Sequence, residues 1–357
     1  MACALCEVLP TRLSGPLDVY ISAPLATVEE RIRAAFAAEQ IQAQDLFNGI
    51  RRYRVSAQTL ETVCSSGLSS LSDRAKRDTR ALIVTPDTNP TIRNLVHMKS
   101  LDGMIAEVEG GGIIEMLEAK RLETWFQPIV SVEDRSLFAY ECLSRGRDAE
   151  DNIIRPDHMF GVARRSNLLY YLDRDARITA IRGASRLGLA SKIFINFNPV
   201  SIYSPETCLQ TTIEELESSN LDADQVVFEI VESDRVRDIG QLTAILDHYR
   251  SRNFKVALDD LGAGFNSLTS LDKLRPDYMK LDLELTRNVD SDPYKARICE
   301  NLLALADKLG VESIVEGIET PDEYRWIRDH GAKYVQGYLI ARPAPEPPEP
   351  DYSWMLT

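Results

Sequence analysis

Two features are scarce in this 357-residue sequence: long apolar runs and an excess of positive charge. No stretch approaches the roughly 20 apolar residues that a membrane-spanning helix needs, and the N-terminus lacks the pattern of a secretory signal peptide. Lys and Arg number 41 against 55 Asp and Glu, a formal net charge of −14. Because phosphate backbones are bound by clustered Lys and Arg, we expect no affinity for nucleic acid polymers. We expect a soluble, cytoplasmic protein without a membrane segment.

The six cysteines form no disulfide framework, which favours a reducing cytosol. Cys3 and Cys6 make a single CxxC, whereas a zinc site needs a second pair, and only Cys64 lies in the same region. The chain is 44% hydrophobic and 27% charged, as in ordinary globular proteins. Its length allows one large domain and a smaller one.

The first 109 residues read as a small α+β domain. Leu17 to Ala23 alternates as a strand does, and Arg80 to Thr85 reads as a second strand. Thr27 and Glu30 form a capping box that predicts a helix after them. No catalytic constellation occurs here, so we expect a regulatory, sensory or dimerising domain of unknown type.

Three glycines at 110–112 suggest a hinge, and residues 113–122 predict a helix that leads into the next domain. We therefore assign residues 110–123 to a hinge and linker helix and residues 124–345 to the main domain. Residues 343–350 are too rich in proline for helix or sheet, which leaves 346–357 as a proline-rich tail.

Apolar strands alternate with helical segments throughout the main domain, a pattern typical of parallel β/α units. Eight such units predict a (β/α)8 barrel. The link between the first two strands, residues 131–137, is too short for a crossover helix, so these strands should form an antiparallel hairpin. The expected strands are Trp125–Val130, Phe138–Leu143, Ile193–Asn198, Val226–Val231, Lys255–Asp260, Tyr278–Asp282, Ser313–Glu316 and Tyr334–Tyr338.

Polar side chains lie in or near the ends of these strands. They are Glu141, Asn196, Glu229, Asp259, Asp260, Lys280, Glu316 and Gln336. A charged residue in an apolar strand is costly unless it is paired or bound to metal, and any one of these alone could be an internal salt bridge. Together they place one Lys among five carboxylates, a set that predicts bound Mg²⁺ or Mn²⁺ because oxygen ligands select hard cations.

Asp259 and Asp260 are adjacent and precede a flexible turn of sequence LGAG. Neighbours in a regular strand point to opposite faces, so both can serve one site only where the strand ends. Two such carboxylates could bridge two metal ions about 3.5–4 Å apart. The alternative is that Asp260 caps a helix starting near Asn266.

Seven short sequence motifs follow one another along the chain. They are 125–129 (WFQPI), 140–145 (YECLSR), 228–233 (FEIVES), 259–268 (DDLGAGFNSL), 280–282 (KLD), 316–320 (EGIET) and 336–338 (QGY). Over about residues 120 to 345 the sequence resembles the EAL-domain family of cyclic-di-GMP phosphodiesterases. Cys142 stands where that family has alanine, and we expect it to be a small buried apolar residue.

The resemblance implies a role for each matching residue. One metal ion would be held by Glu141, Asn196, Glu229 and Asp259, and the second by Asp259 and Asp260; Asn198, of the same strand parity, is an alternative to Asn196. Glu316, Lys280 and Asp260 would be catalytic, with Glu316 acting on the attacking water and Lys280 on water or phosphate. The substrate pocket would be lined by Gln127, Leu143, Arg145, Glu319 and Gln336, with Arg145 on a phosphate. Glu232 would anchor the loop 260–268, which in this family is coupled to dimer contacts.

The expected reaction is two-metal hydrolysis of cyclic-di-GMP to linear pGpG by a phosphodiesterase, which could form a homodimer through the barrel. Two alternatives remain open. One is a catalytically inactive receptor for cyclic-di-GMP, which would typically lack an acidic ligand. The other is a barrel enzyme that cleaves a different phosphodiester.

Overall fold

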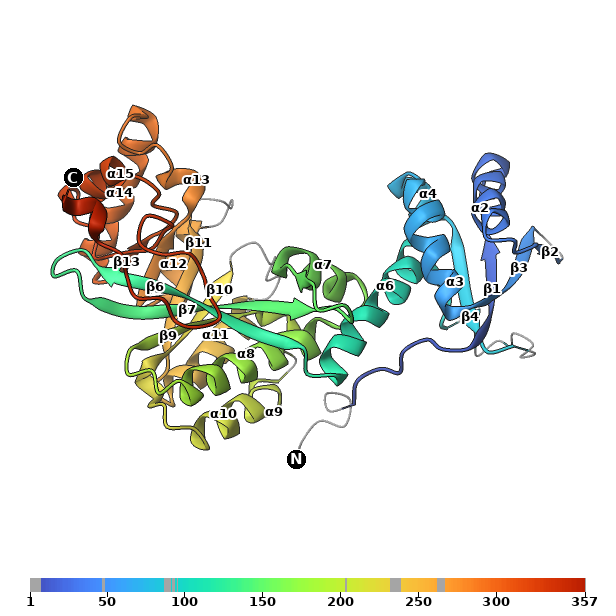
Figure 1. Cartoon of the computed structure of the whole chain (residues 1–357), viewed down its shortest axis with the longest axis horizontal. Coiled ribbons are helices and arrows are strands. Elements are labelled where there is room, and N and C mark those ends of the chain that lie inside the picture. Colours follow the sequence, from blue (N-terminus) through green and yellow to red (C-terminus); the bar gives the residue numbers. More distant parts are fainter. Residues whose placement is uncertain are drawn as a thin grey trace.

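A computed structural model describes residues 8–46, 49–86, 91, 94, 96–202, 204–231, 239–261 and 267–356, without the side chains of 231, 239, 241, 260, 267, 268, 270, 355 and 356. The chain forms a large barrel domain and a smaller N-terminal domain, joined by one long helix (Figure 1). Within these ranges, no helix combines the length and apolar character that crossing a bilayer requires.

The N-terminal domain is built on an antiparallel sheet of five strands in the order β2-β3-β1-β4-β5. This order, with helices between the strands, is that of a split βαβ fold. Its strands are β1 (Pro16–Ser22), β2 (Gln44–Asp45), β3 (Ile50–Ser56), β4 (Arg80–Val84) and β5 (Lys99–Ser100). Its helices include α2 (Ala26–Ala38), α3 (Ala57–Thr62) and α4 (Asp73–Asp78).

The two N-terminal strands expected from the sequence are confirmed by β1 and β4. The capping box is wrong: α2 already begins at Ala26, its N-cap is Leu25, and that residue makes no side-chain capping bond. Packing explains the difference, because Ile32 and Phe36 of α2 are buried in one core with the apolar residues of β1. Burial of that helix face contributes more to the stability of the helix than a terminal hydrogen bond does.

Helix α6 (Leu101–Glu118) connects the two domains and contains all three glycines expected to form a hinge. It runs through them without a break, so the expected interruption is not present. Its first turns, with Met104, pack in the N-terminal core. Its last turns, with Met116, pack against α7 (Pro156–Arg165) and α8 (Leu169–Arg186) of the large domain. A Cβ atom at Gly110 would lie 2.8 Å from Ser166 Cβ, which shows that this glycine permits close packing.

The large domain is a closed barrel of eight main strands, in the order β6-β14-β13-β12-β11-β10-β9-β7, with β7 also paired to β6. Seven strands are parallel, and β6 runs antiparallel to both neighbours. Both the barrel and its reversed strand were predicted. The strands are β6 (Leu122–Ser131), β7 (Leu137–Arg147), β9 (Lys192–Phe197), β10 (Val226–Val231), β11 (Lys255–Leu261), β12 (Tyr278–Leu281), β13 (Glu312–Val315) and β14 (Tyr334–Val335). A short β8 (Ile153–Ile154) pairs antiparallel with the end of β7.

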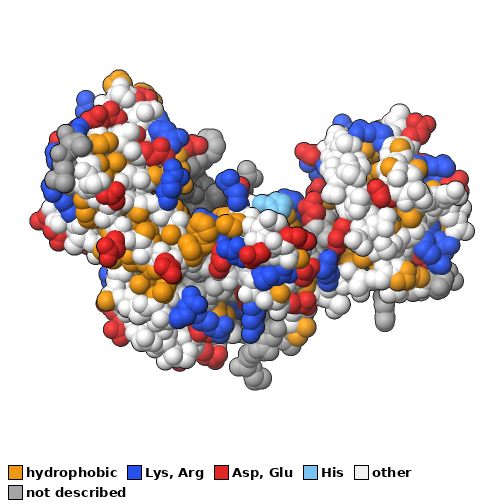
Figure 2. Space-filling view, in the orientation of Figure 1, with side chains coloured by type: hydrophobic (Ala, Val, Ile, Leu, Met, Phe, Trp, Pro, Cys, Tyr) orange, Lys and Arg blue, Asp and Glu red, His pale blue; other side chains and the backbone are white. Residues whose placement is uncertain are grey.

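Helices surround the barrel, as expected for β/α units. They are α7 (Pro156–Arg165), α8 (Leu169–Arg186), α9 (Pro205–Cys208), α10 (Gln210–Glu217), α11 (Ile239–Arg250), α12 (Ser267–Leu274), α13 (Leu283–Thr286), α14 (Pro293–Leu309) and α15 (Pro321–Asp329). Figure 2 shows acidic and basic side chains interspersed on one face of both domains.

Apolar side chains fill one end of the barrel interior. Phe194, Tyr278 and Ile314 are buried together there, and the aromatic rings of Phe194 and Tyr278 lie 5.3 Å apart. The C-terminal tail lies along β6, where Phe126 and Ala344 exchange two backbone hydrogen bonds of 2.7 and 3.1 Å. The opposite end of the barrel, where the parallel strands terminate, is therefore the end at which polar chemistry can occur.

Candidate active site

Seven of the eight polar residues predicted from the strand ends have described side chains, and these converge at the carboxyl end of the barrel. Lys280 of β12 is fully buried, and its Nζ atom is surrounded by carboxylates from four other parts of the barrel. The distances are 2.5 Å to Glu316 Oε1, 2.8 Å to Glu229 Oε1, 3.2 Å to Asp259 Oδ1 and 3.5 Å to Glu141 Oε1. Parallel strands bring their carboxyl ends to one edge, which is why residues up to 175 positions apart in the sequence (141 to 316) meet here.

The local electrostatics are dominated by burial and by this excess of carboxylates. Burial raises the pKa of Glu229 well above its usual range, and the nearby carboxylates of Glu141 and Asp259 add to the shift. Burial likewise raises the pKa of Glu316 to about 8. Burial alone would lower the pKa of Lys280, but the surrounding carboxylates outweigh it and raise that pKa, so the lysine stays charged.

Amide side chains donate hydrogen bonds to both carboxylate oxygens of Glu141. Gln336 Nε2 donates to Glu141 Oε2 at 2.5 Å and to Gln127 Oε1 at 3.0 Å, while Asn196 Nδ2 donates to Glu141 Oε1 at 3.4 Å. Gln336 reaches this position because the chain after β14 passes very close to Ile318: a Cβ atom on Gly337 would lie 2.0 Å from the Ile318 carbonyl oxygen. The amides therefore fix the orientation of one carboxylate of the cluster.

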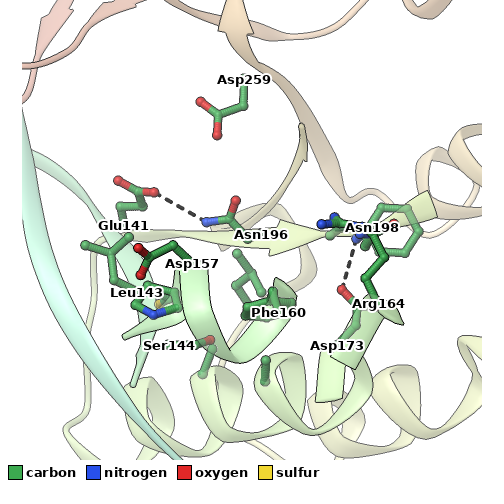
Figure 3. Close-up of a pocket in the computed structure, with 16 residues that line it drawn as sticks. Glu141, Leu143, Ser144, Asp157, Phe160, Arg164, Asp173, Asn196, Asn198 and Asp259 are labelled. Atoms are coloured by element: carbon green, nitrogen blue, oxygen red, sulfur yellow. Dashed lines mark hydrogen bonds between the residues drawn. The ribbon is translucent and has the colours of Figure 1, made fainter. Parts of the chain in front are cut away.

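Two cavities flank the cluster. One, of about 510 Å³, lies between β7, β9 and α7 and is bordered by Glu141, Asn196 and Asp259 (Figure 3). The other, of about 430 Å³, is bordered by Gln127, Lys280, Glu316, Glu319 and Gln336, among others. Both have the size of small-ligand sites. Glu141, Leu143 and Asp259 border both cavities, so a ligand that filled them would pass over the carboxylates.

The structure places the remaining predicted residues as follows. Leu143 and Glu319 border the cavities, and Glu319 Oε1 also accepts a hydrogen bond from Arg287 Nη2 at 2.7 Å. The Arg145 guanidinium lies over the Trp125 ring, 5.3 Å from its centroid, and donates to its neighbour's carbonyl, Ser144 O. Burial lowers the pKa of Arg145.

Two of the predicted residues lie outside the described part. Glu232 and most of the loop 260–268 belong there, and of Asp260 only the backbone, within β11, is described. Their assigned roles stay predictions. Cys142 is 3% exposed and packs in the apolar layer outside the strands with Ile195, and burial raises the pKa of its thiol.

The donor set suits a hard divalent cation. Among the described side chains, four carboxylates surround Lys280, so this cluster carries a net charge near −3 when all four acids are ionised, and the Asn196 amide contacts one of them, Glu141. Glu229, which is fully buried, accepts no hydrogen bond from the described residues and relies on its ion pair with Lys280. Among the described residues no group of three His, Cys, Asp or Glu forms a ready cation cage. The carboxylates would have to turn from Lys280 towards an ion.

One pair of buried charges was missed from the sequence. Asp173 and Arg177 of α8 form an ion pair, 2% and 0% exposed, and Asp173 borders the larger cavity. The available signal was an Asp-x-x-x-Arg spacing within a helix whose other residues at that face are apolar. Such a spacing usually indicates an exposed helix face.

Comparison with known proteins agrees with this geometry. The EAL domain family matches residues 113–343, well over half of the sequence. This chain belongs to the EAL domain family. The cluster around Lys280 therefore lies at the centre of its EAL domain, and the residues before 113 are an addition to it.

Among curated relatives, the EAL domain is 28% identical over 229 residues to "Probable cyclic di-GMP phosphodiesterase PdeD" of Escherichia coli, a match over 64% of this chain and 43% of that protein. It is 26% identical over 243 residues to "Cyclic di-GMP phosphodiesterase RocR" of Pseudomonas aeruginosa, over 67% of this chain and 62% of that protein. The chain spans less than two thirds of the length of these relatives.

Solved structures extend the comparison. A standalone EAL protein of Vibrio cholerae bound to c-di-GMP is 32% identical with a TM-score of 0.60, over 66% of this chain and 97% of that one. A manganese and cyclic-di-GMP complex of Klebsiella pneumoniae BlrP1 is 21% identical with a TM-score of 0.57, over 92% of this chain and 96% of that one. At this identity it carries only the fold, and its coverage reaches into the N-terminal domain.

Proposed function

We propose that this chain binds cyclic-di-GMP at the carboxyl end of its barrel and hydrolyses one 3′–5′ phosphodiester bond to give linear pGpG. The observation that carries the proposal is the convergence of Glu141, Glu229, Asp259 and Glu316 on Lys280, flanked by two cavities of ligand size. Relatives and neighbours named for cyclic-di-GMP support the choice of substrate.

We propose that two divalent ions, Mg²⁺ or Mn²⁺, act in the reaction. Glu141, Asn196, Glu229 and Asp259 would hold one ion, and Asp259 with Asp260 the second. Bound in this way, the ions would acidify a water molecule and offset the negative charge of the substrate. Neighbouring folds solved with manganese or calcium support a divalent ion.

The chain's own residues supply the rest of the chemistry. Glu316 is suited to accept the proton of the attacking water because its pKa, raised to about 8 by burial, lies near the working pH. Lys280 keeps its positive charge in a dry environment, where it stabilises the charge that grows on the phosphoryl oxygens. Gln336 donates to Glu141 and to Gln127 Oε1, and so holds Glu141 in orientation.

The test is incubation of the purified full-length protein with cyclic-di-GMP and Mn²⁺ or Mg²⁺, with products separated by chromatography. We expect pGpG to appear only with metal, and Glu316→Gln to abolish it. Binding without turnover, measured by calorimetry, would instead make the protein a receptor. Equal or faster cleavage of linear dinucleotides would indicate a different phosphodiester substrate. Absence of both binding and turnover would overturn the proposal.

We also propose that the N-terminal domain regulates this site or mediates a homodimer. The support is α6, which packs in the N-terminal core and against α7, a helix that borders the larger cavity. Light scattering on the full chain, with and without cyclic-di-GMP, tests the homodimer. A monomer under both conditions would remove that part of the proposal.

A further inference from the structure

A second set of buried polar contacts lies beside the carboxylate cluster, outside the residues assigned to catalysis. Asp173 and Arg177, one turn apart on α8, form an ion pair that is almost fully removed from solvent. Burying two charges is costly, and a buried ion pair can often be replaced by apolar residues without loss of stability. The presence of this pair therefore calls for a role beyond packing.

Asp173 binds the segment that follows strand β9. Its Oδ1 atom accepts a hydrogen bond from the backbone N–H of Asn198 at 3.0 Å (Figure 3). Its Oδ2 atom accepts one from Ser201 Oγ at 3.1 Å. Ser201 Oγ also lies 2.7 Å from the carbonyl oxygen of Asn198, so its single hydroxyl proton is shared between this acceptor and Asp173. One carboxylate thus fixes both ends of the short turn 198–201.

Arg177 contacts the last residue of strand β9. Its guanidinium lies over the ring of Phe197, 5.3 Å from the centroid, and its Nε donates to Thr212 Oγ1 of α10 at 3.2 Å. Phe197 and Asn198 are the two residues that directly follow Asn196. The ion pair therefore holds the residues directly after Asn196, whose side-chain amide contacts Glu141.

The geometry points to Asp173 and Arg177 as positioning residues that hold the carboxyl end of β9, so that Asn196 stays aimed at Glu141 in the metal-binding cluster. This inference rests on the proposed function, because it uses Asn196 as a metal ligand. Asn196 Nδ2 lies 3.4 Å from Glu141 Oε1, so a small shift of β9 would separate them. Asn198, the other candidate, is engaged elsewhere: its Oδ1 accepts from the Val200 N–H at 3.1 Å.

The main test is the double variant Asp173→Leu with Arg177→Met in the full-length protein. Replacing both charges at once leaves no unpaired buried charge, so the variant should fold. We expect its affinity for Mn²⁺, measured by calorimetry without nucleotide, to fall roughly tenfold or more, the range seen when groups that orient ligands are removed. The nucleotide is left out because Asp173 also borders the cavity and could touch a substrate directly.

A more conservative substitution tests the same inference if the double variant does not fold. Arg177→Lys keeps a positive charge beside Asp173 but loses the planar guanidinium over Phe197, so Mn²⁺ affinity should fall in the same direction by a smaller factor. In both variants kcat should fall more than KM changes, because the reacting groups are misaligned while the cavities persist.

Matched controls come from the same helix. Arg182→Met removes an arginine that also joins α8 to α10, through hydrogen bonds of 2.6 and 2.9 Å to Glu215, but at the exposed face. Asp175→Asn removes an acid of α8 that forms an ion pair with the adjacent Arg174, at 2.9 Å. Both controls should bind Mn²⁺ as the wild type does.

Each outcome decides the matter. Wild-type Mn²⁺ affinity in the double variant or in Arg177→Lys, at an unchanged unfolding temperature, would overturn the inference. An equal loss in the controls would also overturn it, because general packing of α8 would then explain the effect. Failure of the wild type itself to bind Mn²⁺ would instead count against the proposed function.

Discussion

Lys280 Nζ and Glu316 Oε1 lie 2.5 Å apart at the closed centre of the barrel mouth, one on strand β12 and the other just after β13. The backbone supports this pair, since Glu316 N–H donates to Leu281 O at 3.1 Å and Thr286 Oγ1 donates to Glu316 O at 2.5 Å. The pKa values of both groups are raised, and strongly shifted pKa values of this kind cluster at functional sites.

Replacing Lys280 by Met should remove the single cation from among four carboxylates. We expect kcat for cyclic-di-GMP to fall by about two to three orders of magnitude, because charge on the phosphoryl oxygens loses a fixed donor. Steady-state kinetics with saturating Mn²⁺ measure this loss. Lys308→Met, at an exposed position of α14, is the control and should behave as the wild type. A Lys280→Met variant with near-normal kcat would exclude a catalytic role for this lysine.

Glu141→Ala and Asp259→Ala should each abolish turnover, because each removes an oxygen from the proposed metal cluster. Glu141 has the further task of accepting hydrogen bonds from Gln336 and Asn196. The measurement is product formation together with Mn²⁺ binding, and Glu217→Ala on the exposed face of α10 is the control. Near-normal hydrolysis by either variant would refute the metal assignment.

The stability of the metal-free protein should depend on pH through Glu316. Its pKa is raised by burial from 4.5 to about 8, with Lys280, Asp259 and Glu141 as its charged neighbours. The folded state therefore holds a proton that the unfolded chain releases near pH 4.5. This contribution is fully present below pH 4.5 and is lost as the pH rises through about 8.

Calorimetry on metal-free protein should show the unfolding temperature falling between pH 5 and pH 8. Glu316→Gln, which does not titrate, should show a smaller fall, with a difference on the order of a few kcal/mol across that window. Mn²⁺ should reduce the pH dependence of the wild type, since it replaces protons among the carboxylates. Identical slopes for the wild type and Glu316→Gln would contradict the assignment.

Two neighbouring glycines of α6 should respond oppositely to alanine. At Gly110 the added Cβ would lie 2.8 Å from Ser166 Cβ and 3.1 Å from Leu168 Cδ1, so Gly110→Ala should destabilise the fold by about 1–3 kcal/mol. At Gly112 nothing lies within 4 Å, so Gly112→Ala should stabilise it by about 0.5–1 kcal/mol through higher helix propensity. Urea unfolding measures both changes in stability. A stabilising Gly110→Ala would show that α6 is not tightly packed against Ser166 and Leu168.

The barrel was predictable because its strands carry local signals. Mainly apolar runs such as 226–231 lack the polar face of an amphipathic helix and so indicate buried strands. The link 131–137 is too short for a crossover helix and therefore indicates a hairpin. The register that brings Gln127 opposite Glu141 could not be read in this way, because it depends on a bulge near Ile129. Strand existence is local information, whereas register is set by packing.

Other features failed to show in the sequence for physical reasons. Glycines at 110–112 weaken a helix by propensity, yet α6 continues through them, and Gly110 packs closely against Ser166 and Leu168 between α7 and α8. Asp173 and Arg177 have the spacing of a surface pair, and only the turn after β9 reveals their use. Arg145 was expected on a phosphate, and its position over Trp125 depends on pairing between β6 and β7.

Helix α6 couples the thermal unfolding of the two domains. Its residues before Glu109 belong to one apolar cluster and those after Gly112 to another, so neither cluster can melt and leave the helix intact. A short helix severed from its partners is unstable in water, so loss of one end removes support from the other. Heating should therefore produce a single endotherm, and a fragment cut at the glycines should expose apolar side chains on both pieces.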